Sequence, residues 1–254
     1  MKKKTLSHLL IVILIILFGF SLSGEDAQTI LKKVDEYNSG SKAPADMEAL
    51  MVMNIHKGSS VKTRELKAWT KNNTGEPDWR VMKFLSPADS KNIGLLILTE
   101  NRMYLYLPEF RRIRRIASSS KKNSFQGSDF SFDDLDTVDF SESYTSTIKS
   151  EDDASWLLEL DRKENSGRPY KKILLTVSKE SYMPLVMEMF DNRGDPWKKM
   201  ENKVKKIGEY YIMNFIKIED KKKGSYTTLE LKEIKLDQGL DNSIFTRRFL
   251  KRSI

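Results

Sequence analysis

Apolar and polar residues alternate along most of this chain. In the segment 46–56, every second residue from Met47 to Ile55 is apolar, and the opposite face carries Asp46, Glu48 and His56. This period of two is typical of a β-strand with one buried face. The same pattern predicts strands at about 61–71, 78–85, 93–99, 102–107, 156–161, 172–177, 185–190, 196–205, 209–219 and 225–236.

Two segments have the pattern of a helix instead of a strand. Residues 25–37 place Ala27, Ile30, Leu31 and Val34 at helical spacing, and Asn38-Ser39-Gly40 supplies a stop signal. Near the C-terminus, Asp241 and Asn242 can cap a short helix that carries Phe245 and Leu250.

These elements predict a mainly β protein with flanking helices. Sequential strands joined by short turns pair as neighbours, and a single large antiparallel sheet twists and curls. We therefore expect one curved antiparallel sheet of about 11 strands that forms a half-open, unclosed barrel, with an N-terminal helix and a helical lid or loop insertion. The insertion spans about 108–150, and no linker divides residues 24–254, which indicates a single domain.

The first residues have the features of a signal peptide. Lys2, Lys3 and Lys4 precede an apolar run from Leu9 to Phe20, and small residues at Ser21 and Ser23 suit signal peptidase. We predict a signal peptide at residues 1–23 and a periplasmic protein; the alternative is an uncleaved N-terminal anchor. Cleavage removes three lysines and no acid, so the net charge falls from +8 to +5. This mild excess does not require a nucleic-acid partner.

The absence of cysteine narrows the possible chemistry. A chain of 254 residues with no Cys cannot hold a disulfide scaffold, a thiolate zinc site, an iron–sulfur cluster or a cysteine nucleophile. It also has no cysteine to carry a lipid anchor at the mature N-terminus. His56 is the only histidine after residue 23, and it lies on the polar face of a strand, where we expect a surface residue. We expect no cofactor and no metal.

The insertion contains the strongest candidates for a polar function. The run Arg111–Arg115 could contact anionic headgroups at a cavity mouth, or it could be a charged edge strand. The acids Asp129, Asp133, Asp134 and Asp136 could serve acid/base catalysis or bind a divalent ion, but capping and turn formation is the simpler interpretation. Ser131 followed by Asp134 resembles a capping box, and Gly127-Ser128-Asp129 lacks the pattern of a nucleophile elbow.

Methionines occur on many of the predicted interior strand faces. Flexible thioethers suit a cavity for variable apolar ligands, although they also fill ordinary cores. The methionines concerned are Met47, Met51, Met53, Met82, Met103, Met183, Met187, Met189 and Met213.

Several motifs resemble one known family. They are the run from Phe84 to Gly94 that contains Ser86-Pro87-Ala88-Asp89, Met103-Tyr104-Leu105-Tyr106-Leu107-Pro108, Arg112-Ile113-Arg114-Arg115-Ile116 and the run from Ser124 to Leu135 that contains Gly127-Ser128-Asp129-Phe130. Together they resemble the outer-membrane lipoprotein-sorting proteins of the LolA/LolB-like superfamily, in the branch with a Gly-Ser-Asp-Phe lid signature. The resemblance extends over residues 24–254 and is most specific through residues 84–135.

The resemblance implies a half-open barrel with a lid over an apolar cavity. It implies a non-enzymatic periplasmic carrier that binds acyl chains of lipoproteins or lipids and moves them toward the outer membrane, with an inner-membrane exporter and an outer-membrane acceptor as partners. The alternatives are an envelope-stress sensor or exporter accessory domain of the same fold, or a lipid hydrolase. The arginine that holds the lid shut in the family could be Arg64, Arg80 or Arg102.

On this interpretation, the expected ligand-binding residues are the interior apolar side chains of the barrel and lid. They are Met51, Met53, Met82, Phe84, Met103, Leu105, Phe125, Phe130, Phe132, Leu135, Met187 and Met189, with possible headgroup contacts from Arg112, Arg114 and Arg115.

Overall fold

The computed structural model describes residues 25–73, 76–136 and 138–254. The predicted signal peptide, residues 1–23, lies outside the described residues. Within the described residues, no helix is long and apolar enough to cross a membrane.

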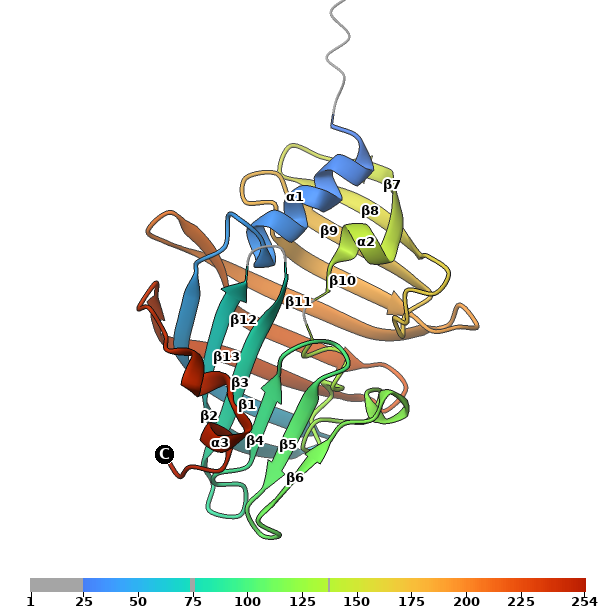
Figure 1. Ribbon diagram of the computed structural model, residues 1–254. Coiled ribbons are helices and arrows are strands. Elements are labelled where there is room, and N and C mark those ends of the chain that lie inside the picture. Colours follow the sequence, from blue (N-terminus) through green and yellow to red (C-terminus); the bar gives the residue numbers. More distant parts are fainter. Residues whose placement is uncertain (1–24, 74–75, 137) are drawn as a thin grey trace, which may run out of the picture.

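One antiparallel sheet forms the body of the protein (Figure 1). Among the described residues it has 13 strands, so the prediction of a large sheet is confirmed with two strands more than expected. The strands are β1 (Asp46–Lys57), β2 (Ser60–Asn73), β3 (Glu76–Ser86), β4 (Gly94–Ile97), β5 (Met103–Leu107), β6 (Arg112–Arg115), β7 (Tyr144–Glu151), β8 (Ser155–Arg162), β9 (Lys172–Ser178), β10 (Pro184–Phe190), β11 (Pro196–Ile207), β12 (Tyr210–Asp220) and β13 (Ser225–Leu236).

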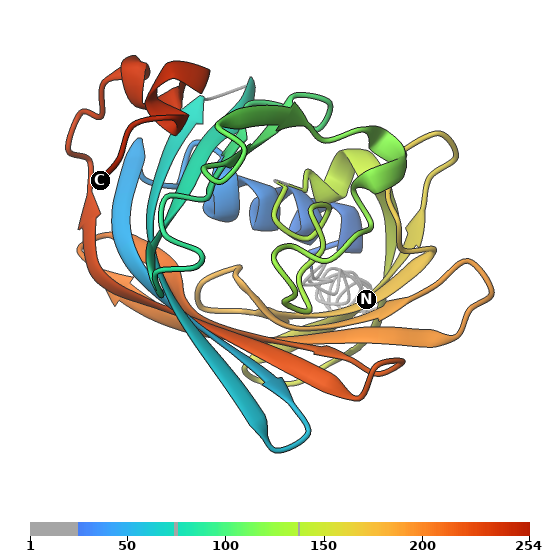
Figure 2. The same cartoon turned by 90° about the horizontal axis from the view of Figure 1, so that it is seen from below.

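The order of the strands explains the open shape. The sheet runs β6-β5-β4-β3-β2-β1-β13-β12-β11-β10-β9-β8-β7, so the first and last strands pair in its middle. Its two edges, β6 and β7, are consecutive in the sequence. The sheet curls around an interior without closing (Figure 2). The chain between the edges, residues 116–143, must therefore cross the concave side, and we call it the crossing segment.

The crossing segment is shorter than the insertion expected from the sequence. β6 and all of β7 except Glu151 lie within residues 108–150. A strand at β6 was one of two interpretations of the arginine run, and no strand was predicted at β7. β6 is a run of arginines, and most of β7 is exposed, so neither strand has an alternating apolar face. The crossing segment contains the 3₁₀ turn η2 (Ser118–Ser120) and the short helix α2 (Phe140–Ser143), and its remainder is irregular.

The predicted N-terminal helix is α1 (Ala27–Ser39). The Asp26 carboxylate accepts hydrogen bonds from the backbone N–H groups of Gln28 and Thr29, which satisfies unpaired donors at the helix start. Its apolar stripe is buried against the concave side of the sheet. In Figure 1, α1 lies across one open end of the half-barrel, next to α2 and β7.

The C-terminal segment covers part of the convex face. The 3₁₀ turn η3 (Asn242–Phe245) and helix α3 (Arg247–Leu250) confirm the predicted helical end of the chain. Phe245 and Leu250 form a second apolar cluster with Trp69, Val81, Leu96 and Tyr106. A Cβ atom at Gly94 would lie 2.7 Å from Leu250 Cδ1, so close packing of α3 on β4 requires glycine there.

Candidate functional site

The interior of the half-barrel contains an apolar cavity. It has a volume of about 270 Å³ and lies between the concave face of the sheet, the C-terminal end of α1 and the crossing segment. Seven methionines line it: Met47, Met51, Met82, Met183, Met187, Met200 and Met213. Because thioether side chains adapt to different apolar shapes, this wall suits a flexible hydrocarbon ligand.

The predicted ligand-binding residues divide into two groups. Five of them, Met51, Met82, Phe130, Leu135 and Met187, line the cavity. The other seven do not line it and are packed in the adjoining apolar core: Met53, Phe84, Met103, Leu105, Phe125, Phe132 and Met189. A ligand-binding role for the first group stays a prediction.

Sequence reasoning left several lining residues out of the predicted site. Met47 and Met213 lie on strand faces identified as interior, and Met183 directly precedes β10. Nothing in the sequence set these three residues apart from the packed methionines. Lys198 and Asn202 lie on the same strand face as Met200. Because these neighbours are polar, the sequence pattern did not indicate that Met200 points into the interior.

One wall of the cavity changes from apolar to polar along its length. The strand pairs Leu66–Phe84 and Ala68–Met82 are followed on the same face by Thr70–Arg80. Asp78, on the same face of β3, is 4 % exposed, and burial raises the pKa of its carboxyl group despite the opposing charge of Arg80. The polar end of the wall therefore lies toward the start of β3, where Asn72 and Asp78 also line the cavity.

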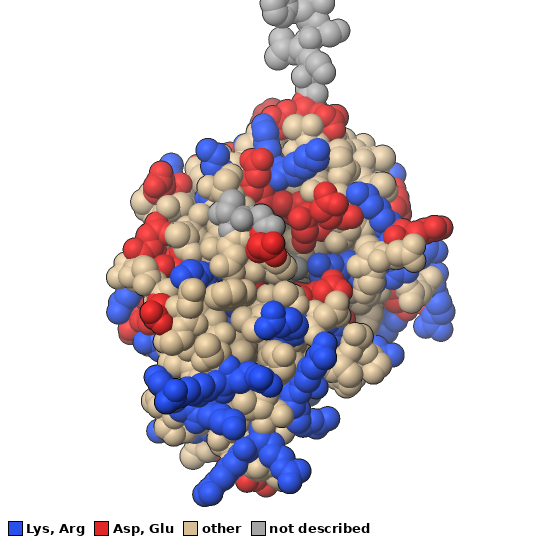
Figure 3. All heavy atoms as spheres, in the orientation of Figure 1, with Lys and Arg blue, Asp and Glu red and all other residues tan. Residues whose placement is uncertain are grey.

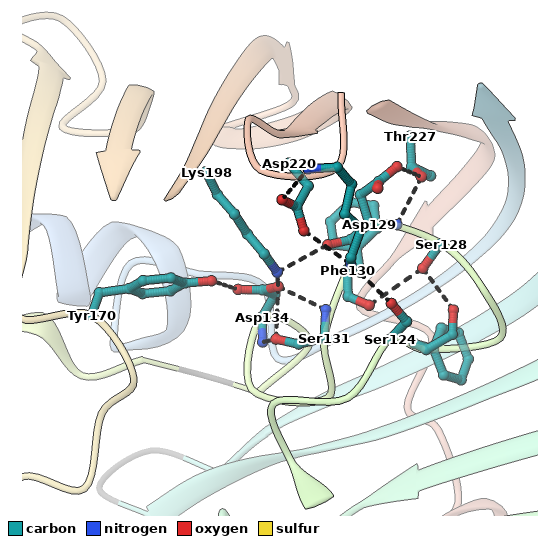
Figure 4. A network of polar contacts seen from close by, with 12 residues as sticks. Ser124, Ser128, Asp129, Phe130, Ser131, Asp134, Tyr170, Lys198, Asp220 and Thr227 are labelled. Atoms are coloured by element: carbon teal, nitrogen blue, oxygen red, sulfur yellow. Dashed lines mark hydrogen bonds and ion pairs between the residues drawn. The ribbon is translucent and has the colours of Figure 1, made fainter. Parts of the chain in front are cut away.

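Asp129 of the Gly-Ser-Asp-Phe motif attaches the crossing segment to the sheet. Its carboxylate accepts hydrogen bonds from the hydroxyl groups of Ser225, at 2.5 Å, and Thr227, at 2.7 Å, both on β13 (Figure 4). Its backbone N–H donates to Thr227 Oγ1 at 3.0 Å. Asp129 is 1 % exposed. A carboxylate so deeply buried requires these partners, so the motif fixes the segment's position.

A second buried polar group lies beside Asp129. Lys198 Nζ lies 2.5 Å from Asp134 Oδ2 and donates to the Asp129 carbonyl oxygen at 2.9 Å (Figure 4). The Tyr170 hydroxyl donates to the other Asp134 oxygen. Asp134 also forms the predicted reciprocal hydrogen bonds with Ser131, but a tight turn follows in place of a helix. Breaking such a buried pair is costly, since one charge would remain uncompensated.

Two arginines hold the crossing segment through its backbone. Arg64 Nη1 donates to the Gln126 carbonyl oxygen at 2.6 Å, and Arg80 Nη1 donates to the Leu135 carbonyl oxygen at 3.3 Å. Arg102, the third arginine considered from the sequence, is exposed beside the β4–β5 turn. Arg80 and Leu135 both line the cavity, whereas Arg64 and Gln126 lie outside its lining. The geometry therefore favours Arg80 as the arginine that holds the segment over the cavity.

The four acids considered as candidates from the sequence all have structural contacts. Asp129 and Asp134 belong to the network described above, Asp133 lies 3.8 Å from Lys121, and Asp136 lies 3.5 Å from Arg168. These contacts agree with the capping and turn-forming interpretation. His56 stacks on Tyr226, with ring centroids 4.2 Å apart. In the part of the chain that the structure describes, no group of three or more His, Cys, Asp or Glu residues could hold a metal ion.

The arginines predicted as headgroup contacts lie away from the cavity. Arg112, Arg114 and Arg115 are exposed on the edge strand β6, and none of them lines the cavity. The alternative interpretation of this run, a charged edge strand, matches the observed sheet. The charges prevent a further strand from adding to this edge.

Known proteins share this architecture. The model of one protein family, described as "-like: Uncharacterized protein", matches residues 76–252. No curated protein matches the chain. The solved structures that resemble it include a DUF1329 family protein from Desulfovibrio piger, with a TM-score of 0.82 and 23% sequence identity; 89% of this chain and 100% of that chain are covered.

Two further solved structures share the fold. One is a domain from Vibrio parahaemolyticus named for outer membrane lipoprotein sorting, with a TM-score of 0.78 and 23% identity over 87% of this chain and 98% of that chain. The other is a LolA superfamily protein from Nitrosomonas europaea, with a TM-score of 0.69 and 20% identity over 89% of this chain and all of that chain, 100%. The resemblance recognised in the sequence is confirmed at the level of the fold.

Proposed function

We propose that this chain, which belongs to the family whose model matches residues 76–252, is a periplasmic carrier that binds acyl chains in its cavity. The ligand is the acyl portion of a lipoprotein or another lipid, held while it moves toward the outer membrane. The chain acts by binding and not by catalysis. An inner-membrane exporter would load it, and an outer-membrane acceptor would unload it.

The methionine-lined cavity under the crossing segment is the observation that carries this proposal. Each methylene group that enters the cavity from water contributes about 0.8 kcal/mol. The cavity volume of about 270 Å³ lies just below the range of about 300–1,000 Å³ that is common for small-molecule pockets. A long chain would therefore extend into space that the crossing segment now covers.

The contacts of the crossing segment would allow one part of it to move away from the cavity when a long acyl chain binds. The Arg64 and Arg80 contacts are single hydrogen bonds to backbone oxygens, whereas the Asp129 and Asp134 network is buried. A ligand could displace the Arg80 contact, which borders the cavity, and leave the buried network intact. The segment would then open near Leu135, which lines the cavity, and remain fixed at Asp129.

Lipid extraction and a binding assay would test the proposal. Organic extracts of the exported protein should contain a lipid with long acyl chains, and the delipidated protein should bind a fluorescent fatty acid. Met82→Trp, which fills the cavity, should reduce this binding at least tenfold. The control variant is Val61→Trp, because Val61 is 53% exposed and lies outside the cavity lining.

Two results would contradict a carrier role. One is a delipidated wild-type protein that binds no fatty acid. The other is equal binding by wild type and Met82→Trp, which would show that the probe binds elsewhere. Release of free fatty acid from a phospholipid or lipoprotein would instead indicate the hydrolase alternative.

A further inference from the structure

The end of the molecule formed by β5, β6 and the C-terminal segment carries a dense group of exposed basic side chains. In Figure 3, Lys and Arg gather over the lower part of the molecule, where Figure 1 places β4, β5, β6 and α3. The group, which we call the basic face, consists of Arg111, Arg112, Arg114, Arg115, Arg247, Arg248, Lys251 and Arg252. None of the ion pairs between described residues includes any of them.

The two halves of the basic face are fixed next to each other. The Arg247 guanidinium group lies over the ring of Tyr104, 5.4 Å from its centroid. Tyr104 pairs with Arg115 across the β5–β6 ladder, so both residues point to the convex side of the sheet. Arg112 and Arg114 pair with Leu107 and Leu105 and point to the other side of β6, so the basic side chains surround this edge strand. The Lys83 ammonium group donates to the carbonyl oxygen of Arg252, which holds the C-terminal residues against the same surface.

An apolar residue projects from this face. Phe110, at the turn between β5 and β6, is 60% exposed, the largest fraction among the exposed large apolar residues of the described chain. Arg111 and Arg112 follow it directly, and Glu109 is the only acid from residue 108 to residue 116. The turn forms a protruding tip at the lower end of the molecule in Figure 1.

We propose that the basic face docks on an anionic phospholipid bilayer, with Phe110 entering the headgroup layer. Basic side chains gain from the negative surface potential of anionic lipids, and aromatic side chains favour the membrane interface. An apolar group and a polybasic surface reinforce each other in attachment to a membrane. A protein partner would favour a flat or concave surface, whereas a protruding tip with an exposed aromatic ring suits a deformable lipid layer.

Docking in this orientation would place the edge strand β6 and the start of the crossing segment close to the bilayer. β6 is an edge of the sheet, and the crossing segment begins at Ile116, directly after this strand. The inference goes beyond the proposed function, since a surface that binds headgroups needs no acyl chain in the cavity.

Vesicle sedimentation would test the proposal. The protein recovered after export should bind vesicles of phosphatidylcholine with phosphatidylglycerol, and salt should weaken this binding. It should bind vesicles of phosphatidylcholine alone much more weakly. Replacing Arg112, Arg114 and Arg115 together by Gln should weaken binding about 100-fold, since each charge contributes about fivefold. Phe110→Ser should weaken binding about five- to tenfold and leave the salt dependence unchanged.

A matched control removes the same charge elsewhere. Lys203, Lys205 and Lys206 of β11 are exposed, and their replacement by Gln should leave vesicle binding within about twofold of wild type. All variants change exposed side chains, so thermal unfolding should match wild type, and fatty-acid binding in the cavity should be unchanged. Wild-type protein that does not bind the anionic vesicles would overturn the proposal, as would equal weakening by the lysine and arginine triplets. Binding to an acidic protein partner without binding to vesicles would also overturn it.

Discussion

Met51 and Met53 offer a direct test of where the core ends and the cavity begins. Both lie on the concave face of β1, two residues apart, and both were predicted as ligand-binding residues. Met51 is 8 % exposed and lines the cavity, whereas Met53 is 1 % exposed and does not. The same substitution at these positions should therefore have different consequences.

Replacement by alanine should separate the two positions by stability. Met53→Ala leaves a void in a close-packed region and should reduce the free energy of unfolding by about 2–5 kcal/mol. Met51→Ala enlarges a space that already exists, so few neighbouring contacts are lost, and its cost should stay below about 2 kcal/mol. Urea unfolding of the delipidated proteins measures both values.

Replacement by tryptophan should separate them by function. Met53→Trp overpacks the core and should cost about 1–3 kcal/mol or more. Met51→Trp can project into the cavity of about 270 Å³, so it should unfold near the wild-type urea concentration and lose fluorescent fatty-acid binding. Equal costs for the two alanine variants, together with unchanged fatty-acid binding by Met51→Trp, would refute the assignment of a ligand cavity to this wall.

Three further predictions concern the crossing segment and its contacts. Asp129→Ala should lower the free energy of unfolding by at least about 2 kcal/mol in urea titrations, because hydroxyl partners on β13 lose a charged acceptor. Asp133 makes an ion pair of 3.8 Å with Lys121, so Asp133→Asn should change the free energy of unfolding by less than about 1 kcal/mol. Equal effects of the two substitutions would disprove a specific role for Asp129. Arg80→Gln should speed fatty-acid release in stopped-flow displacement several-fold. Because this change also removes the 3.6 Å ion pair with the buried Asp78, the control is Asp78→Asn, which loses the ion pair and keeps the Arg80 contact with Leu135. Equal release rates for Arg80→Gln and the control would show that this contact does not hold the segment closed. Burial, with Asp139 nearby, raises the pKa of Asp35 to about 7, so the folded state binds this proton more tightly than the unfolded state. Stability should therefore rise as the pH falls from about 7 to about 4. Asp35→Asn should flatten that part of the plot of melting temperature against pH.

Local patterns determined most of the secondary structure. The alternation in β1, the helical spacing in α1 and the caps near Asp241 each depend on residues a few positions apart, and these elements were predicted correctly. Periodicity also separated interior from exterior faces, so the strand residues predicted to bind the apolar ligand are buried, except Met187, which is partly buried. It failed at β6 and β7, because edge strands have little buried surface to impose alternation on the sequence.

Only the tertiary structure decided how these faces meet. The pairing of β1 with β13 brings together strands from opposite ends of the described chain, and it makes β6 and β7 the edges that the crossing segment must connect. Asp129 reaches Thr227, 98 positions away, and Lys198, an unremarkable strand lysine in sequence, becomes buried against Asp134. The curvature of the sheet then determines which interior methionines pack and which border empty space. Strand periodicity defines a face, but whether side chains across the barrel fill the space opposite it depends on contacts between residues distant in the sequence.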